Sequence, residues 1–363
     1  MKHKPAPGTR APEIPFPFCY DTPDHYLLTA SAPTGLLSRL EKNLPRIRRL
    51  AWITILPGIL LSLSATLPAP AEPEDSPLVV DGMRLINGTQ LYCKSIGTGV
   101  PLVILHGGPG LDHSYLLPQM EKLADTYELI FFDQRGCGKS SIRVDSSAMT
   151  LDALVEDIDR IRDAYNLSTM NLMGHSWGGL LAMFYAIKHG DRLNSLILVN
   201  STPPTSALRS ASFKLMEERT TREDSLAQAA LVRTAGFKRR EPAAMQEYFR
   251  LLFRGTFRNR LMADELTLTF GPDYGARSKL VQHLAKDPQL QTYNLLGKLE
   301  TIKCPVLIIG SDYDLSPPES NERIHKHIEG SRYVVMKNCG HFPFIEAPAQ
   351  FFPAVRDFLE KSR

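Results

Sequence analysis

The sequence predicts an α/β fold with a mostly parallel central sheet, flanking helices and a helical cap inserted late in the chain. Three observations support this prediction. From Pro77 onward, short apolar runs each end in a polar or glycine-rich loop, as buried parallel strands do. Stretches with helical spacing of apolar residues lie between these runs. The strand pattern stops over residues 203–300 and then resumes, which indicates an inserted segment.

The first two strands are predicted to form a hairpin. Residues 83–86 and 90–96 flank Asn87-Gly88, a dipeptide that favours the tight turn between antiparallel strands. A helix is expected at 151–165, where apolar residues recur on one face that would cover the sheet. The remaining strands are expected at 102–105, 129–132, 171–173, 195–199, 305–310 and 333–337. These elements assign residues 72–202 and 301–363 to the core.

Residues 203–300 are predicted to form the cap. The stretches SLAQAALVRTA and MQEYFRLLFRGTF are too long and too periodic for loops. This segment holds 16 basic and 11 acidic residues. A solvated helix surface accounts for the excess of positive charge.

The amino end differs from the rest of the chain. Residues 1–77 hold 13 of the 27 prolines and show no hydrophobic period that a helix or strand needs. We therefore expect residues 1–49 to be an unfolded, proline-rich leader.

Residues 50–71 resemble a secretory signal. An uncharged run with the apolar heart AWITILPGILLSLSATL follows a basic flank and ends in Ala69-Pro70-Ala71, a small-x-small cleavage pattern. The preferred interpretation is export to the periplasm or the medium. The alternatives are an uncleaved anchor, with membrane contact only through residues 50–67, and a cytoplasmic protein in which the run is a buried helix.

Composition excludes several classes of protein. The 363 residues carry 42 basic and 39 acidic side chains, so the formal net charge of +3 gives no electrostatic reason to expect nucleic acid as a partner. The five cysteines show no CxxC or Cys/His ligand spacing. We expect no metal, no organic cofactor and no disulfide within residues 80–363.

The motif Gly174-His175-Ser176-Trp177-Gly178 joins a predicted strand to a predicted helix. A G-x-S-x-G motif in this context is typical of a nucleophile elbow, in which glycines permit a sharp turn that exposes the serine hydroxyl. Ser176 also lies at the positive end of the helix that follows. His175 is expected to be a packing and hydrogen-bonding neighbour.

A serine hydroxyl needs a base, and the base needs an orienting carboxylate. His341 and Asp314 follow the last two predicted strands, so both are expected at the carboxyl edge of the sheet with Ser176. Asp312 competes for the acid role, and loop spacing favours Asp314. The order Ser, Asp, His along the chain is the order that this kind of fold imposes.

A tetrahedral intermediate requires two backbone N–H donors for its oxyanion. Trp177, which follows the nucleophile, is the first predicted donor. The second is expected in the loop after the strand at 102–105, where Gly108 is the first choice and Gly107 the second.

Four motifs together resemble the proline iminopeptidase branch of the α/β-hydrolase superfamily. They are HGGPG at 106–110, DQRGCGKS at 133–140, GHSWGG at 174–179 and GHFPFIEAP at 340–348, and the resemblance covers about residues 80–360. It implies that Ser176 is the nucleophile, His341 the base and Asp314 its orienting acid, with Gly108 and Trp177 as the oxyanion hole. The family removes an amino-terminal residue, often proline, from short peptides, and its cap supplies carboxylates that hold the free amine.

These motifs do not determine the substrate. The leading hypothesis is an aminopeptidase acting on a short peptide or another small molecule. The alternatives are a carboxylesterase or lactonase with the same triad, and a non-catalytic binding protein. Amine specificity requires at least one cap carboxylate to face the pocket. The candidates are Glu217, Glu218, Glu247, Asp264 and Glu265.

Overall fold

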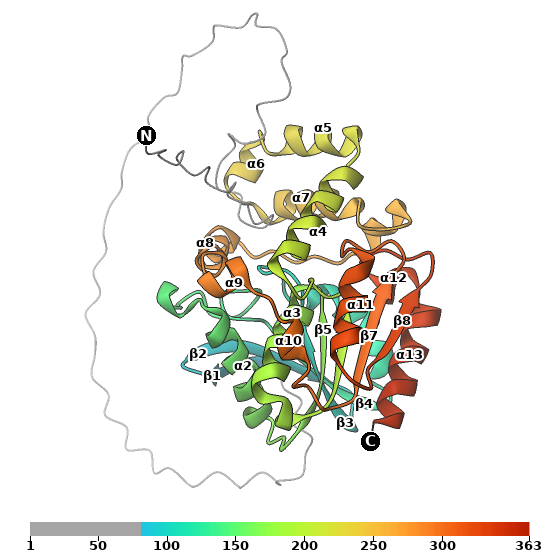
Figure 1. Cartoon of the computed structure of the whole chain (residues 1–363). Coiled ribbons are helices and arrows are strands. Elements are labelled where there is room, and N and C mark those ends of the chain that lie inside the picture. The colour runs from blue at the N-terminus through green and yellow to red at the C-terminus, as the bar shows by residue number, and fades with distance from the viewer. Residues whose placement is uncertain (1–80, 363) are drawn as a thin grey trace, which may run out of the picture. The chain divides into compact units, whose positions relative to one another are not determined.

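An eight-stranded sheet runs through the middle of the computed structural model, which describes residues 81–362 (Figure 1). Its order is β1-β2-β4-β3-β5-β6-β7-β8. The strands are β1 (Asp81–Ile86), β2 (Thr89–Ile96), β3 (Val100–Leu105), β4 (Tyr127–Phe132), β5 (Met170–His175), β6 (Leu193–Val199), β7 (Val306–Ser311) and β8 (Arg332–Met336). The predicted leader at 1–49 and signal at 50–71 lie outside the described residues.

The six strands from β4 to β8 in this order pair in parallel, whereas β2 pairs in the antiparallel sense with both β1 and β4. Asn87 and Gly88 form the predicted turn between β1 and β2, with φ of 44° and 74°. Each strand lies within two residues of its predicted bounds. The predicted α/β fold with a mostly parallel sheet is therefore confirmed.

Helices lie between the strands and after the last of them. They are α1 (Leu117–Met120), α2 (Leu151–Ala164), α3 (Trp177–His189), α4 (Ser206–Arg219), α5 (Arg222–Leu231), α6 (Ala235–Lys238), α7 (Pro242–Arg254), α8 (Tyr274–Ala285), α9 (Pro288–Thr292), α10 (Leu296–Leu299), α11 (Pro318–His327), α12 (Pro343–Glu346) and α13 (Pro348–Lys361). Short 3-10 helices span His113–Tyr115, Glu121–Leu123, Ser146–Ala148, Gly190–Arg192 and Arg260–Glu265.

Each face of the sheet packs against its own apolar layer. Alternate strand residues enter opposite layers, so Ile104 packs with α1, α12 and α13, whereas Val103 packs with α2, α3 and α11. Helix α2 shows how the sequence determines one of these helices. Thr150 caps it by accepting from the Ala153 N–H at 3.2 Å, and its apolar stripe is buried against the sheet.

Helices α4 to α10 connect β6 to β7 (Figure 1). The two stretches that the sequence predicts as helical within this segment form α5 and α7. The loops after β3, β5, β7 and β8 leave the carboxyl ends of parallel strands, so they converge at one edge of the sheet.

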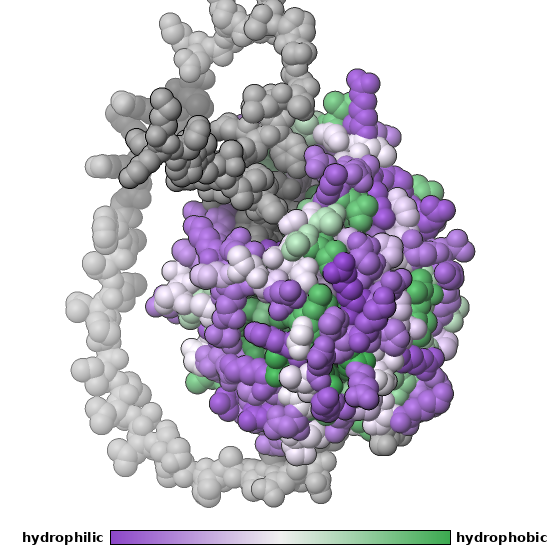
Figure 2. Space-filling view, viewed as in Figure 1, coloured by the Kyte–Doolittle hydropathy of each residue, from purple (hydrophilic) through white to green (hydrophobic). Residues whose placement is uncertain are grey.

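The surface in Figure 2 is mostly hydrophilic, with apolar side chains in scattered groups. Across residues 81–362, none of the helices is both long enough and apolar enough to span a bilayer.

Candidate active site

Ser176 occupies a sharp turn between β5 and α3. Its backbone has φ 55° and ψ −120°, a conformation that residues other than glycine rarely adopt. A Cβ at Gly174 would lie 2.3 Å from the carbonyl oxygen of Gly178, and one at Gly178 would lie 2.5 Å from that of Leu105. Only glycine fits at these two positions, so the sequence motif is what allows the chain to turn here.

His341 and Asp314 meet at the carboxyl edge of the sheet. The Nδ1–H of His341 donates to Oδ1 of Asp314 at 2.6 Å, and both side chains are buried. The same oxygen accepts from the Leu315 N–H at 2.7 Å. Because Nδ1 carries the proton in this bond, Nε2 of His341 is left as the basic nitrogen.

Asp312 lies on the other side of the same loop. Its carboxylate accepts from the backbone N–H groups of Asn338 at 2.9 Å and Cys339 at 3.1 Å. These bonds hold the turn that leads to His341. Of the two candidate acids, the structure therefore brings Asp314 to the imidazole and uses Asp312 to shape the loop.

Ser176 and His341 line the same pocket. Among the contacts described for residues 81–362, no hydrogen bond joins the Ser176 hydroxyl to the imidazole. Bonds between a nucleophile and its base are often long without substrate and tighten when the substrate binds.

Gly108 and Trp177 also line this pocket. Trp177 is the first residue of α3, where a backbone N–H has no partner within the helix. The N–H of Gly107 donates to the hydroxyl of Tyr115 at 2.7 Å, so it is already engaged. Gly108 is therefore the better placed of the two predicted loop donors.

His175 connects the loop of Gly107 to the loop of His341. Its Nε2 faces the carbonyl oxygen of His341 at 2.9 Å, and its Nδ1 faces the Tyr115 hydroxyl at 2.7 Å. A carbonyl only accepts, so Nε2 carries the proton and Nδ1 accepts from Tyr115. Burial, followed by the nearby His341, lowers the pKa of His175 well below its usual range and keeps it neutral. The expected neighbour role of His175 agrees with this geometry, whereas no sequence pattern pointed to Tyr115.

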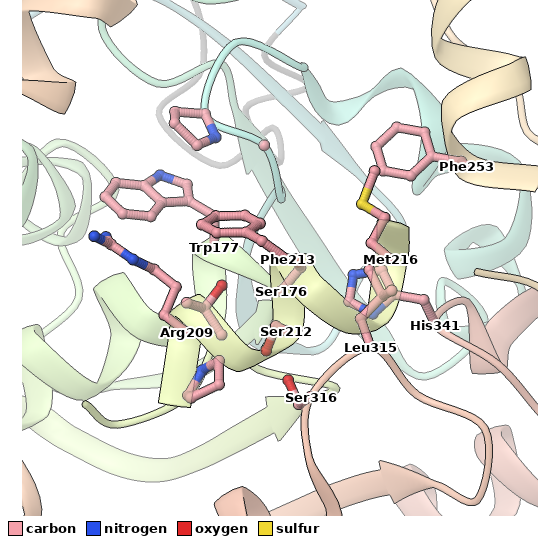
Figure 3. Close-up of a pocket in the computed structure, with 14 residues that line it drawn as sticks. Ser176, Trp177, Arg209, Ser212, Phe213, Met216, Phe253, Leu315, Ser316 and His341 are labelled. Atoms are coloured by element: carbon pink, nitrogen blue, oxygen red, sulfur yellow. The ribbon is translucent and has the colours of Figure 1, made fainter. Parts of the chain in front are cut away.

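Helix α4 forms one wall of the pocket (Figure 3). Figure 3 shows Arg209 and Trp177 on one side of the view and His341, Met216 and Phe253 on the other. The described residues that line the pocket are Gly108, Pro109, Ser176, Trp177, Thr202, Pro203, Arg209, Ser212, Phe213, Met216, Phe253, Leu315, Ser316 and His341. The wall from α4 was missed at the sequence level, because this helix buries few residues and carries no clear apolar stripe.

Arg209 is the basic member of this wall. Its Nη2 donates to the carbonyl oxygen of Leu290 at 2.8 Å, and its guanidinium lies 5.3 Å from the centre of the Tyr293 ring. Burial lowers the pKa of Arg209 from its ordinary value.

The candidate cap carboxylates lie elsewhere. None of the five is among the described residues of the pocket wall. Glu217 and Glu265 are exposed, and Glu218 is exposed and lies 3.9 Å from the Lys214 ammonium. Glu247 and Asp264 both pair with Arg250, at 2.7 and 2.5 Å. Glu218, Glu247 and Asp264 therefore lie beside basic side chains of the cap rather than in the pocket wall.

Arg219, at the end of α4, ties the cap to the acid loop. Its Nη1 donates to the carbonyl oxygens of Tyr313 and Asp314, both at 2.9 Å. Its guanidinium also lies 3.9 Å from the centre of the Tyr313 ring. The backbone of Asp314 is thus held from above by a cap residue.

Within the described part of the chain, no group of three or more histidine, cysteine, aspartate or glutamate side chains is arranged to hold a metal ion. In the same residues, Cys93, Cys137, Cys304 and Cys339 are free thiols.

Comparison with known proteins also indicates a hydrolase. The family model described as alpha/beta hydrolase fold matches residues 100–348. The proline iminopeptidase of Lactobacillus crispatus is 30% identical over 301 residues, which cover 78% of this chain and 99% of that protein. The proline iminopeptidase of Heyndrickxia coagulans is 30% identical over 273 residues, or 72% of this chain and 91% of its own.

Solved structures agree on the fold. The crystal structure of proline iminopeptidase from Mycobacterium smegmatis superposes with a TM-score of 0.58 at 21% identity, covering 77% of this chain and 98% of that one. A thermophilic esterase from Thermogutta terrifontis superposes with a TM-score of 0.55 at 27% identity, covering 76% and 94%. The chain therefore belongs to the α/β-hydrolase superfamily, in its proline iminopeptidase-like branch, and is a hydrolase.

Proposed function

We propose that the chain is a serine hydrolase that works through an acyl-enzyme and releases the amino-terminal residue, proline above all, from small peptides. The observation that carries this proposal is the 2.6 Å bond between His341 and Asp314 at the wall of the pocket that Ser176 lines. A base oriented by a buried carboxylate, next to a serine on a strained turn, is the arrangement that nucleophilic acyl transfer requires.

The reaction begins when the Ser176 oxygen attacks the scissile carbonyl and Nε2 of His341 accepts the hydroxyl proton. Asp314 stabilises the imidazolium that forms and keeps the ring in its orientation. The carbonyl oxygen becomes an oxyanion, which accepts hydrogen bonds from the N–H groups of Gly108 and Trp177.

The tetrahedral intermediate then collapses. His341 returns the proton to the leaving amine or alcohol, and the acyl group stays on the Ser176 oxygen. Water attacks this ester with the imidazole as base, and the second collapse frees the acid and restores the serine hydroxyl.

The relatives at 30% identity, both named proline iminopeptidase, support peptides with a free amino terminus as substrates. The pocket suits the compact ring of proline, because much of its wall is apolar and comes from Phe213, Met216, Phe253 and Leu315.

A carboxylesterase or lactonase is the second candidate, and one observation favours it. Among the described residues of the wall, the ionisable side chains are His341 and Arg209, which include no carboxylate. An ammonium bound there would lack charge-assisted hydrogen bonds that are worth about 1.5–3 kcal/mol each. An uncharged acyl group needs no carboxylate partner, so it would lose no binding energy in this wall.

Three substrates tested side by side separate the candidates: a proline chromogenic amide, its amino-blocked version and a short acyl ester. Each is assayed with wild type, Ser176→Ala and Ser210→Ala. Ser210 lies on α4 and its hydroxyl donates to the Ser206 carbonyl, so it is a matched serine outside the pocket wall.

The aminopeptidase proposal requires cleavage of the free amide, loss of cleavage on blocking, and activity that depends on Ser176 but not on Ser210. Cleavage of the ester alone would support the esterase or lactonase. Full activity in Ser176→Ala would contradict the triad itself.

A further inference from the structure

Gln134 lies in the loop after β4, within the DQRGCGKS motif, and is 3% exposed. Its amide Nε2 donates to the carbonyl oxygen of His106 at 2.8 Å. Its Oε1 accepts from the indole Nε1–H of Trp177 at 2.9 Å. One side chain therefore binds both segments that carry the proposed oxyanion donors.

In the first of these segments, the His106 carbonyl, the Gly107 N–H and the Gly107 carbonyl are all hydrogen-bonded. In the peptide unit between His106 and Gly107, the carbonyl accepts from Gln134 and the N–H donates to the Tyr115 hydroxyl. Both sides of this unit are fixed, so it cannot rotate without breaking a buried hydrogen bond.

The next peptide unit supplies the donor itself. The carbonyl oxygen of Gly107 accepts from Nδ1 of His106 at 2.7 Å. The N–H of Gly108 belongs to the same planar trans unit, so it points away from that carbonyl. Gly108 itself lines the pocket.

The backbone of Gln134 fixes the histidine that does this. Its N–H donates to Nε2 of His106 at 3.0 Å, so Nε2 is unprotonated and the proton resides on Nδ1, where it bonds to Gly107. Gln134 thus acts on the Gly108 donor through its main chain and its side chain together.

The second segment is the start of α3. The indole of Trp177 is buried, and its only N–H donates to Gln134. This bond locates the first residue of the helix relative to the loop after β3, because the same side chain binds the His106 carbonyl.

We propose that Gln134 is a positioning residue for the oxyanion hole: it sets the separation and the direction of the Gly108 and Trp177 donors. This inference rests on the proposed function, because it needs a tetrahedral intermediate to act on. It assigns a role to the DQRGCGKS motif that the triad leaves unused.

The test uses Gln134→Met in the full chain, which keeps the length of the side chain and removes both amide bonds. Asn171→Leu is the matched control. Asn171 is also a buried amide that bridges two elements, donating to the Pro101 carbonyl at 3.0 Å and accepting from Ser195 at 2.8 Å. It lies at the start of β5, the end of the strand remote from Ser176.

Four quantities are measured for each variant: kcat and KM on a chromogenic acyl ester, affinity for an alkyl boronic acid, which mimics the tetrahedral intermediate, and melting temperature. We expect Gln134→Met to lower kcat and boronate affinity together by about 10- to 100-fold, with KM changed less than about threefold. Asn171→Leu is expected to lower the melting temperature while kcat and boronate affinity stay within about threefold of wild type.

A second variant, Gln134→Leu, serves if the methionine variant does not fold. Leucine also removes both amide bonds, to the indole and to the His106 carbonyl, so the same losses are expected. If the folded variant keeps kcat and boronate affinity within about threefold of wild type, the positioning role is wrong.

Labelling of Ser176 by a fluorophosphonate distinguishes failure of the Gln134 role from failure of the proposed mechanism. If wild type is labelled at Ser176 while Gln134→Met keeps wild-type kcat, only the role of Gln134 is overturned. If active wild type is not labelled at Ser176, the proposed mechanism fails and the positioning role fails with it.

Discussion

His175 donates a hydrogen bond to the backbone carbonyl of His341, so the residue before the proposed nucleophile holds the loop of the proposed base. Because the same imidazole accepts from Tyr115, whose hydroxyl receives the Gly107 N–H, three loops of the site are linked by buried bonds. The link works only while His175 is neutral.

Protonation of His175 is expected to destabilise the fold. Its pKa in the folded chain is lowered, chiefly by burial, whereas an unfolded histidine titrates near about 6.5. The unfolded chain therefore binds more protons below that pH, and stability falls as the pH drops through about 6.5 towards the lowered value. In His175→Gln the slope of unfolding free energy against pH should decrease by up to about 1.4 kcal/mol per pH unit.

Urea unfolding at pH 7.5, 6.5 and 5.5 measures this slope, with His283→Gln, at an exposed histidine of α8, as the control. Parallel curves for wild type and His175→Gln would show that His175 does not contribute.

The two acids of the β7 loop are expected to respond differently to amide substitution. Asp314→Asn should lower kcat by about 10³- to 10⁴-fold, because an amide no longer fixes the tautomer of His341 or stabilises its cation. Asp312→Asn should change kcat less than about tenfold and cost about 1–2 kcal/mol of stability, because it weakens the bonds to Asn338 and Cys339. Steady-state kinetics and thermal melting of both variants decide the matter, and equal losses of kcat would contradict the assignment.

Arg219 is expected to matter for catalysis although it lies outside the pocket wall. Lysine cannot reproduce the stacking on Tyr313 together with the bonds to two carbonyls. Arg219→Lys should lower stability by about 1 kcal/mol and kcat several-fold, since Asp314 loses a backbone restraint. The exposed Arg222, changed to lysine, is the control. A kcat equal to wild type would show that the acid loop is rigid without the cap.

Arg209 should discriminate against positive charge in the pocket. Removing its charge relieves a repulsion of about 1 kcal/mol on a nearby ammonium. Arg209→Gln should therefore raise kcat/KM for the free-amine proline amide, relative to the acyl ester, by about fivefold. Lys214→Gln, on the exposed side of α4, controls for general loss of charge. An unchanged ratio would mean that the amine binds beyond the reach of Arg209.

Much of the site could be predicted because its parts are local in sequence. Ser176 sits in a turn where Gly174 is required by a contact with Gly178, only four residues away. The strand before this turn and the helix after it are visible in the apolar pattern. The choice of Asp314 over Asp312 rested on its distance from the end of a strand, and the structure brings that residue to His341.

Other features depend on partners far apart in the chain. The bonds of Gln134 reach His106 and Trp177, which are 28 and 43 residues away, and no periodicity encodes such pairs. The position of the cap acid Asp264 was equally hidden, because its pairing with Arg250 depends on how α7 packs against the chain that follows it.

The turn at Ser176 also has a consequence for how this protein can change. A side chain at φ 55° and ψ −120° costs about 1–3 kcal/mol, and glycine adopts this backbone without that cost. An inactive Ser176→Gly chain is thus expected to melt above the active one. Selection for stability alone would replace the serine at this position with glycine, so the serine is retained by selection for catalytic activity.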